Sequence, residues 1–559
     1  MKINLLEIAM IATEHPGLLA LVLGLFILAL VVVVSTPSIL PQFIITSCFD
    51  THSDPQNSSS RTDLSNIPGP VLARLSRLWL IWVDYTGHRT RTIHALHQKH
   101  GPVVRIGPNE VSFSSRQAMR DIYGAANGFI KAPVYEAFGR PSSFTIRNKE
   151  AHRARQKRIA HVFAPAAIAD VEPLVHEQVR ALLSALDKRV GETIDLMEWF
   201  RIFALDVVGA VFLGRDFGGL ASEVAPGILH DLDEVFPSLW IEWQFASIRW
   251  LLLCLPIQSL RHFLKAGPNF YNYGASAFKA YVSQYGRSGT RRDLLTKLIS
   301  GAKGADPLQD HEIVNEMTNL IFAGTDTTSN TFSYMFYELA KLPHWQDRLQ
   351  AELDQVAFTE IPEYKDIRAL DVLDAVIHET LRLHPSAPAS LQRVVPATGG
   401  VVDGIRVPGK AIVSCQSFSV QRDPEVYPNP DTYDPDRWLT ASEDQVAAMH
   451  DRILVWGKGS RSCLGKQLAY MELKVATAAI MKRFRVELGS AATDDDMEMT
   501  DHFTLIAKGR RSVKCQPAKK TNVHKLYAPV FHNKFNSSSN PHIGCVTPSP
   551  NGATDESNG

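Results

Sequence analysis

The sequence lacks several features that define common classes of protein. Its 559 residues include only six cysteines, and none form a Cys-x-x-Cys pair, so neither a disulfide framework nor that kind of zinc site is indicated. Neither sign of charge is in surplus, because 58 Lys and Arg balance 58 Asp and Glu. Nucleic-acid binding needs excess positive charge, so the balance argues against a nucleic-acid partner. The remaining composition, 45% hydrophobic and 21% charged, is that of a globular protein.

One long apolar run is present, from Gly17 to Val34. Its 18 residues carry no polar or charged side chain, and a helix of that length spans roughly 27 Å, close to the thickness of a bilayer core. A cleavable signal peptide is the alternative, but its apolar part is usually shorter and no small-x-small cleavage site follows. We therefore expect residues 1–36 to be a retained membrane anchor, 37–66 a linker, and 516–559 a disordered tail. Charge alone does not set the orientation of the anchor.

Residues 67–515 show mainly helical periodicity with a few short strand patterns and no internal repeat. This pattern predicts one large domain that is mainly α with small β-sheets, an α+β fold. Hairpins are expected at 103–113, around Gly107-Pro108-Asn109, and at 401–407, around Asp403-Gly404. The longest predicted helix has Asp310 as its N-cap, continues to Leu342, and is stopped by Pro343.

The most informative segment is 456–465, Trp-Gly-Lys-Gly-Ser-Arg-Ser-Cys-Leu-Gly. Gly457 and Gly459 allow a tight backbone. Cys463 precedes an apolar helix expected from Leu464 to about Phe484, whose positive end favours the thiolate over the thiol. Gly465 leaves the backbone open to a flat ligand, and Arg461 offers a fork for a carboxylate. Together these features indicate a site for one face of a haem.

This segment resembles the haem-binding loop of the cytochrome P-450 family, Phe-Gly-x-Gly-x-Arg-x-Cys-x-Gly, with Trp456 in place of Phe. The resemblance implies that Cys463 is the axial thiolate ligand of the iron of haem b, in a site shaped by Arg461, Gly457, Gly459 and Gly465. Trp456 is expected to cover the sulfur side of the ring and to donate an indole hydrogen bond to the thiolate. A buried structural cysteine beside a glycine turn is the alternative.

A second motif, Ala-Gly-Thr-Asp-Thr-Thr at 323–328, lies in the middle of the long helix. Glycine and threonine weaken a helix, so a local bulge is expected there. Thr327 falls on the same stripe as Leu320 and Ala323, and the adjacent Asp326 is expected to connect to solvent. The resemblance implies that both are catalytic: Thr327 hydrogen-bonds dioxygen while Asp326 relays protons from water.

Further basic and acidic residues match family positions. Glu379 and Arg382 lie three residues apart, a weak signal alone because Glu177 and Arg180 have the same spacing. The resemblance adds Arg437 and implies a buried structural network. It also implies that Arg393 and His152 contact the haem propionates. Where a further arginine is expected, the sequence has Gln156, with Arg155 and Lys157 as candidate substitutes.

The matching pocket positions are apolar or aromatic and indicate a lipophilic small-molecule substrate; they are Phe138, Phe144, Leu320, Ala323, Ala389 and Leu505. The resemblance implies a monooxygenase of secondary metabolism that inserts one oxygen atom from dioxygen. No flavin or nicotinamide motif follows Cys463, so electrons are expected from NADPH through a separate cytochrome reductase. The implied location is the endoplasmic reticulum membrane, with a single N-terminal span in the lipid and a cytosolic catalytic domain.

Two other functions fit the same motifs. One is a reductase-independent haem-thiolate isomerase or peroxygenase, which the intact Asp326–Thr327 pair disfavours. The other is a non-enzymatic membrane haem protein.

Overall fold

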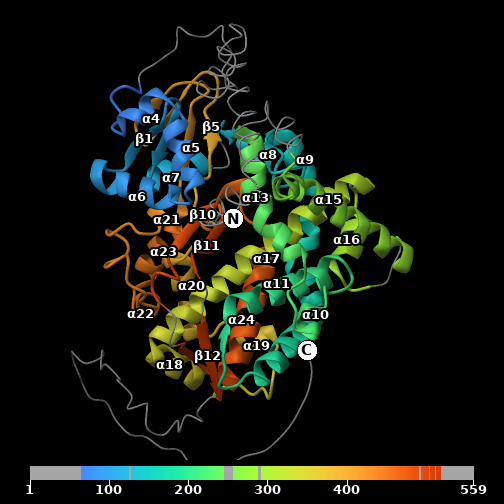
Figure 1. Ribbon diagram of the computed structural model, residues 1–559. Helices are drawn as coiled ribbons and strands as arrows, with labels where there is room; N and C mark the ends of the chain where they lie inside the picture. The colour runs from blue at the N-terminus through green and yellow to red at the C-terminus, as the bar shows by residue number, and fades with distance from the viewer. Residues whose placement is uncertain are drawn as a thin grey trace, which may run out of the picture. The chain divides into compact units, whose positions relative to one another are not determined.

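The computed structural model describes residues 64–124, 127–244, 256–287, 291–489, 493–502, 504–509 and 512–517 (Figure 1). The predicted anchor, nearly all of the predicted linker and the predicted tail beyond residue 517 lie outside these ranges. Within them, no helix combines the length and apolar character that a membrane crossing requires. The described residues all belong to one compact unit that ends at Lys519.

Helices make up most of the described chain, as predicted. In order they are α4 (Val71–Leu75), α5 (Leu78–Tyr85), α6 (Arg89–His100), α7 (Arg116–Tyr123), α8 (Val134–Ala137), α9 (Lys149–Ile159), α10 (Pro165–Asp187), α11 (Leu196–Phe212), α12 (Gly219–Ser222), α13 (Ile228–Gln244), α15 (Gln258–Tyr285), α16 (Leu294–Ser300), α17 (Asp310–Lys341), α18 (Pro343–Leu353), α19 (Tyr364–Ile367), α20 (Asp371–Leu383), α21 (Ser417–Val420), α22 (Asp436–Leu439), α23 (Glu443–Arg452) and α24 (Lys466–Arg483), with short 3₁₀ turns η2 (Ala160–Phe163) and η4 (Gly459–Arg461).

Helix α17 is the long predicted helix, but its first turn is capped one residue earlier than expected. Gln309, not Asp310, is the N-cap, because Gln309 keeps an extended backbone and its N–H donates to the Glu312 carboxylate at 2.9 Å. Asp310 is already helical and places its carboxylate in the first turn, where the helix dipole favours it. At the other end α17 stops at Lys341, and Pro343 begins α18, a position where its missing N–H costs nothing.

The core forms around α17, which packs on α11, α15, α20 and α24 (Figure 1). Phe200 of α11 stacks on Phe332 of α17 with ring centroids 4.9 Å apart and lies 5.1 Å from Phe336. Aromatic pairs of this kind add about 0.5–1.5 kcal/mol each beyond the area that they bury. The middle of α17 is therefore held rigidly from several sides.

The strands form small sheets. The largest has the order β1 (Val103–Gly107), β2 (Glu110–Phe113), β8 (Ile412–Cys415), β5 (Arg393–Val394) and β3 (Ile130–Lys131). A three-stranded sheet has the order β4 (Thr193–Asp195), β12 (Ser512–Pro517) and β9 (Phe484–Leu488), and two hairpins pair β6 (Gly400–Val402) with β7 (Ile405–Val407) and β10 (Met499–His502) with β11 (Thr504–Ala507).

Both predicted hairpins are confirmed. Strands β1 and β2 pair antiparallel, and so do β6 and β7. In the second hairpin Asp403 and Gly404 both have positive φ, 51° and 73°, which is the geometry of a type I′ turn. A mainly helical fold with small sheets, the predicted α+β class, is confirmed as well.

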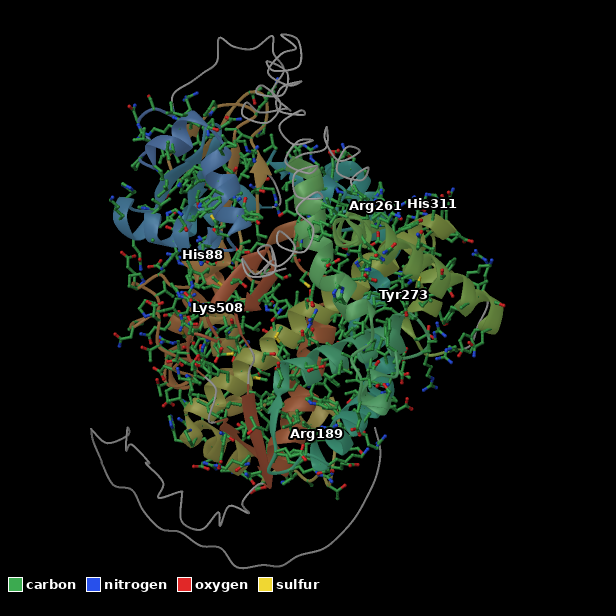
Figure 2. The ribbon with its side chains drawn as sticks, in the orientation of Figure 1. His88, Arg189, Arg261, Tyr273, His311 and Lys508 are labelled. Atoms are coloured by element: carbon green, nitrogen blue, oxygen red, sulfur yellow. The ribbon has the colours of Figure 1, made fainter. Side chains whose placement is uncertain are left out.

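Ion pairs on the surface add little to this fold. Arg189 lies 2.5 Å from Glu223, and Lys508 lies 2.6 Å from Asp495 (Figure 2). Exposed pairs contribute about 0–1 kcal/mol each. The packed core around α17 therefore stabilises the fold more than its surface charges do.

Candidate active site

The cysteine loop is folded back on itself so that Cys463 stands before α24. Gly457 and Gly459 both have φ of 64°, a left-handed conformation that suits glycine. The Cys463 N–H donates to the Trp456 carbonyl at 2.7 Å and closes the loop. The helix that follows begins at Lys466 with Gly465 as its N-cap, two residues later than predicted. Cys463 therefore lies between this turn and the N-terminus of α24.

The Cys463 thiol is accessible, yet the surrounding protein desolvates it. Desolvation raises the pKa of the thiol above its usual value and outweighs the N–H groups of Gly465 and Lys466, which lower it. The helix end thus favours the thiolate, as predicted, but burial opposes it more strongly. A cation bound to the sulfur would favour the anionic form.

The cysteine loop is fastened to α20 through Gln421, which the sequence analysis did not identify. The Gln421 side-chain oxygen accepts the N–H groups of Leu454 and Val455 at 2.8 and 2.9 Å. Its amide nitrogen donates to the carbonyls of Leu381 and Arg382 at 2.8 and 3.0 Å. Because glutamine is common in many settings, no sequence pattern marks this role.

The predicted network forms, because the structure brings Glu379, Arg382 and Arg437 together. It adjoins Gln421, which binds the Arg382 carbonyl. Arg382 binds both Glu379 carboxylate oxygens at 2.8 Å, and Arg437 reaches the same carboxylate at 3.0 Å. Trp438 completes the set through its indole N–H, also at 3.0 Å. Burial alone would raise the pKa of Glu379, but the two arginines lower it below its usual value. The buried charges are thus paired and hydrogen-bonded, as stability requires.

Helix α17 carries the acid and the alcohol without the predicted bulge. Its hydrogen-bonded helix is continuous from Asp310 to Lys341. The glycine at position 324 is explained by close packing instead, because a Cβ there would lie 2.6 Å from the Val208 side chain of α11. Leu320, Ala323, Gly324 and Thr327 are only half-buried and form one stripe, whereas the four residues between them on the helix are buried. The Thr327 hydroxyl donates to the Ala323 carbonyl at 2.6 Å.

Asp326 does not reach solvent directly, contrary to expectation. It is 7% exposed and lies 3.5 Å from the Arg201 guanidinium of α11. Arg201 also binds Asp233 of α13 at 2.6 Å, and that carboxylate is 54% exposed. Desolvation raises the pKa of Asp326, while Arg201 lowers it. The path from Asp326 to water therefore leads through Arg201 and Asp233.

A group of buried basic side chains gathers beside the cysteine loop. Lys131 of β3 and Arg393 of β5 are directly opposite each other in the sheet, and both are 6% exposed. Burial, Arg393 and Arg461 together lower the pKa of Lys131 far below its usual value. Burial and the same Arg393 lower the pKa of Arg461 to about 10. We call Lys131, His152, Arg393 and Arg461 the basic cluster.

The basic cluster lacks an acidic counterpart in the described part of the chain. None of its four members forms an ion pair with a described Asp or Glu. Arg393 donates to the Gln392 carbonyl at 2.9 Å, and Arg461 donates to the carbonyls of Ile146 and Arg147 at 2.6 and 3.0 Å. Burial, Arg461 and Lys131 lower the pKa of His152 to about 3, so its ring is neutral at physiological pH. Such a cluster suits a ligand with negative charge.

The structure also decides between the candidate substitutes near Gln156. Arg155 is not one of them, because it binds Glu312 at 2.6 Å and Glu316 at 2.7 Å. Lys157 is exposed, and Gln156 is half-buried one turn after His152. Lys131 stands instead next to Arg393. In the sequence Lys131 merely follows a short apolar stretch. Only the pairing of β3 with β5 shows that it lies beside Arg393.

The predicted pocket residues separate into two groups. Phe138 and Phe144 contact each other with centroids 5.7 Å apart, and Lys131 lies over the Phe144 ring at 4.3 Å. Leu320 and Ala323 belong to the half-buried stripe of α17, and Ala389 is half-buried as well. Phe138 and Phe144 therefore lie beside the basic cluster, and Leu320 and Ala323 lie on α17. Ala389 lies on the segment that leads into β5.

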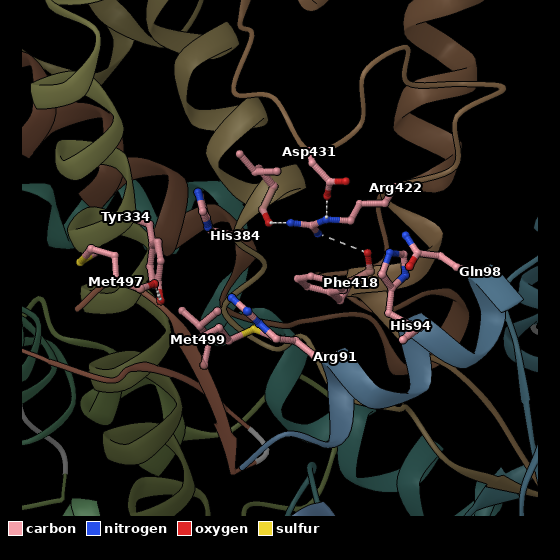
Figure 3. Close-up of a pocket in the computed structure, with 13 residues that line it drawn as sticks. Arg91, His94, Gln98, Tyr334, His384, Phe418, Arg422, Asp431, Met497 and Met499 are labelled. Carbon is pink, nitrogen blue, oxygen red and sulfur yellow. Dashed lines mark hydrogen bonds and ion pairs between the residues drawn. The ribbon is translucent and has the colours of Figure 1, made fainter. Parts of the chain in front are cut away.

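Leu505 is not part of that group. It is buried with Tyr334, Met497 and Met499 and lines a different pocket of about 330 Å³, together with Arg422 and Phe418 (Figure 3). Neighbouring side chains of a strand point to opposite faces. A position can therefore be matched to the correct strand, here β11, and still be assigned to the wrong face.

Trp456 does not make the predicted hydrogen bond to sulfur. Its indole ring packs on Tyr470 with centroids 5.3 Å apart. The indole nitrogen is buried and has no hydrogen bond of normal geometry to a described residue. It contributes apolar packing behind the cysteine loop.

Comparisons with known proteins agree with this geometry. Residues 68–513 match the family description Cytochrome P-450. A cytochrome P-450 monooxygenase called hepC from Aspergillus oryzae is 30% identical over 82% of this chain and 93% of its own length. Pisatin demethylase from Fusarium vanettenii is 30% identical over 76% of this chain and 86% of its own. A crystal structure of a cytochrome P-450 haem domain superposes with a TM-score of 0.68 at 17% identity, covering 81% of this chain and 97% of that one. The chain belongs to the cytochrome P-450 family of haem-dependent oxidoreductases that incorporate oxygen.

Proposed function

We propose that this protein is a haem-thiolate monooxygenase that inserts one oxygen atom of dioxygen into a lipophilic small molecule of fungal secondary metabolism. The observation that carries the proposal is the basic cluster beside an accessible, desolvated Cys463. Haem b has a flat apolar ring, an iron that binds thiolate, and two carboxylates. Each of these features has a counterpart in the residues around Cys463.

The basic cluster fits the two carboxylates of haem. Without an anion, burial and the neighbouring Arg393 disfavour the charge of Lys131 and hold its pKa far below the usual value. In the proposed complex Lys131, Arg393 and Arg461 would hold the propionates through charge-assisted hydrogen bonds. His152, which is neutral, would add one hydrogen bond rather than a charge.

The bound haem iron would supply the binding and reductive activation of dioxygen, and the protein would supply position and protons. The Cys463 sulfur would bind the haem iron. Asp326 would hold a proton more readily than an exposed aspartate, because burial raises its pKa. Arg201, which binds both carboxylates and stays protonated, would position Asp326 near the exposed Asp233, and Thr327 would orient the group that accepts the proton.

The half-buried stripe of α17, with Phe138 and Phe144, supports an apolar substrate. The names of the relatives support oxidation of small molecules, since one is a pisatin demethylase and others are monooxygenases of Aspergillus species. We further propose that electrons come from NADPH through a separate reductase. Residues 1–36, with their 18-residue apolar run, would anchor a cytosolic domain to the endoplasmic reticulum membrane.

The function is tested by producing the full chain together with a fungal NADPH-dependent reductase and comparing metabolite extracts with those from Cys463→Ala. The proposal predicts at least one lipophilic compound that carries an additional oxygen atom and derives it from ¹⁸O₂. Turnover that needs only peroxide would instead indicate a peroxygenase. A product without added oxygen would indicate an isomerase.

A further inference from the structure

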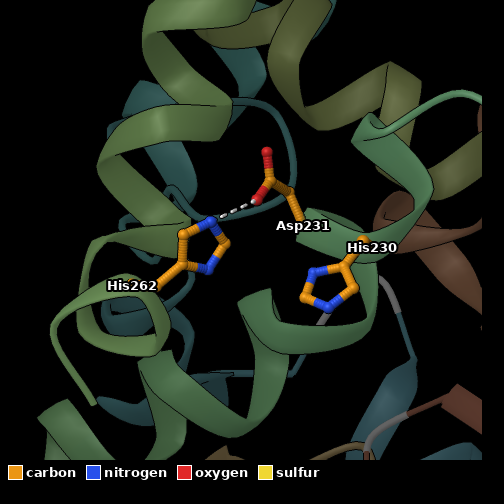
Figure 4. A group of neighbouring side chains, drawn as sticks. All are labelled: His230, Asp231 and His262. Carbon is orange, nitrogen blue, oxygen red and sulfur yellow. Dashed lines mark ion pairs between the residues drawn. The ribbon is translucent and has the colours of Figure 1, made fainter. Parts of the chain in front are cut away.

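A set of metal-ligand side chains lies where α13 packs against α15 (Figure 4). His230 and Asp231 belong to α13, and His262 belongs to α15. Their ligand atoms all lie within 4.8 Å of one another. It is the only such group of three or more His, Cys, Asp or Glu side chains in the described ranges. None of the three has a part in the proposed oxygen chemistry.

The geometry of His262 indicates a place for a cation. Its Nδ1 lies 3.1 Å from the Glu234 carboxylate, so Nδ1 can donate its proton to Glu234. In that tautomer Nε2 carries the lone pair that a metal ion binds, and it lies 3.9 Å from the Asp231 carboxylate. That distance is too long for a hydrogen bond, and it leaves room for a cation between the two atoms.

The size of the gap suits a transition metal. Zinc binds imidazole nitrogen at about 2.0–2.1 Å and carboxylate oxygen at about 2.0–2.2 Å, so one ion can touch both atoms across this separation with small side-chain movements. His230 supplies a second imidazole, whose ring centroid lies 5.8 Å from that of His262. Because His230 and His262 are exposed, a fourth position is open to water. Two nitrogens and one oxygen favour zinc or nickel over calcium or magnesium.

We propose that His230, Asp231 and His262 bind one divalent transition-metal ion that ties α13 to α15. Glu234 acts as a positioning residue, because its hydrogen bond holds the His262 ring in the ligating tautomer. The ion links two helices that already meet through side-chain packing and the His262–Glu234 hydrogen bond. Asp233, two residues beyond Asp231 on α13, binds Arg201, so the ion also restrains the helix that completes the path from Asp326 to water.

The proposal is tested by titrating Zn²⁺ into the chelator-treated full chain with haem bound, followed by calorimetry. We expect one zinc ion per chain and a higher thermal unfolding temperature in its presence. His230→Ala, His262→Ala and Asp231→Asn should each weaken zinc affinity at least tenfold and abolish the thermal shift. Glu234→Gln should weaken it about tenfold through the ring orientation. Mg²⁺ should have no effect.

His88→Ala is the matched control, because His88 is exposed and its side chain makes no capping hydrogen bond (Figure 2). This variant should bind zinc like the parent chain. Two results would overturn the proposal: no zinc binding by the full chain, or binding that is unchanged in both His230→Ala and His262→Ala. The first would mean that the three side chains hold no ion, and the second would mean adventitious binding elsewhere.

Discussion

Lys131 and Arg393 lie directly opposite each other on β3 and β5, so two basic side chains are buried next to each other on one face of the sheet. No ion pair joins either of them to an acidic residue of the described ranges. Opposing like charges destabilise a pair of strands, and burial increases the cost. The arrangement therefore makes sense for a site that receives an anion.

Lys131→Met should separate the stability of the protein from its hold on haem. Methionine keeps the side-chain length but removes the charge, so the haem-free protein should be as stable as the parent chain or more so. The haem-bound protein loses one charge-assisted hydrogen bond, worth about 1.5–3 kcal/mol, and should release haem at least tenfold faster. Transfer of haem to excess apomyoglobin measures that rate.

Lys157→Met is the control for this prediction, since Lys157 is exposed on α9 near the same region. It should leave haem release unchanged. If both variants lose haem at the rate of the parent chain, Lys131 does not contact the cofactor.

Glu379→Ala should prevent stable haem incorporation. The change leaves Arg382 fully buried without its carboxylate, at a cost of about 3–5 kcal/mol. Arg382 also donates to the carbonyl of Gln421, whose side chain holds Leu454 and Val455 of the segment before Cys463, so the disturbance reaches the cysteine loop. The ratio of haem absorbance to protein in purified material gives the result.

Glu177→Ala is a matched control with the same Glu-x-x-Arg spacing. Glu177 and Arg180 are both exposed, so this change should alter the free energy of unfolding by no more than about 0.5 kcal/mol. Equal loss of haem in the two variants would contradict a specific role for the buried network.

Asp326→Asn should uncouple oxygen consumption from product formation. The amide cannot pass on a proton, and positioned proton donors contribute about 10²–10⁴-fold to a reaction rate. We expect at least a tenfold lower ratio of product to NADPH consumed. Asp233→Asn should give a smaller loss in the same direction, because Asp233 acts through Arg201. An unchanged ratio in Asp326→Asn would show that protons arrive by another path.

Buried His97 should make the protein sensitive to mild acid. Its Nδ1 faces the Gly101 carbonyl and its Nε2 faces the Ser112 hydroxyl, a neutral arrangement, and burial lowers its pKa to about 4. Between that value and the unfolded pKa of about 6.5 the unfolded state binds more protons, so stability is complete above the unfolded value and decreases as the pH falls. Between about pH 8 and pH 5 the His97 contribution should decrease by roughly 2 kcal/mol.

Unfolding by urea at several pH values measures this loss. His97→Gln should remove about that part of the pH dependence, whereas His88→Gln, at an exposed site, should leave it unchanged. Parallel pH profiles for His97→Gln and the parent chain would mean that His97 is not neutral in the folded state.

Local patterns in the sequence were sufficient for much of the fold. The turn residues Asp403-Gly404 fixed one hairpin, and Pro343 marked the end of α17. The N-cap of α17 was wrong because Gln309 uses a reciprocal bond with Glu312, a less common choice than aspartate. The predicted bulge was wrong because Gly324 serves contact with Val208, which is distant in sequence.

The parts of the candidate site that lie within one short motif, around Cys463 and Thr327, were predictable from the sequence. The parts that depend on contacts between distant segments were not. The Lys131–Arg393 pairing depends on the register of two-residue strands, and the role of Gln421 depends on a meeting of three segments. The pKa of the Cys463 thiol was not predictable, because desolvation, which the sequence does not reveal, opposes the nearby N–H groups.

The most direct test of the central claim, that Cys463 is the sulfur ligand of a haem iron, is the absorption spectrum of the reduced, carbon-monoxide-bound full chain. The account predicts the strongly red-shifted Soret band of thiolate-ligated haem for the parent chain, and its loss in Cys463→Ala. Cys415→Ala, which removes the buried cysteine of β8, should keep the band if the chain still folds. A red-shifted band that persists in Cys463→Ala, or a parent chain without bound haem, would contradict the claim.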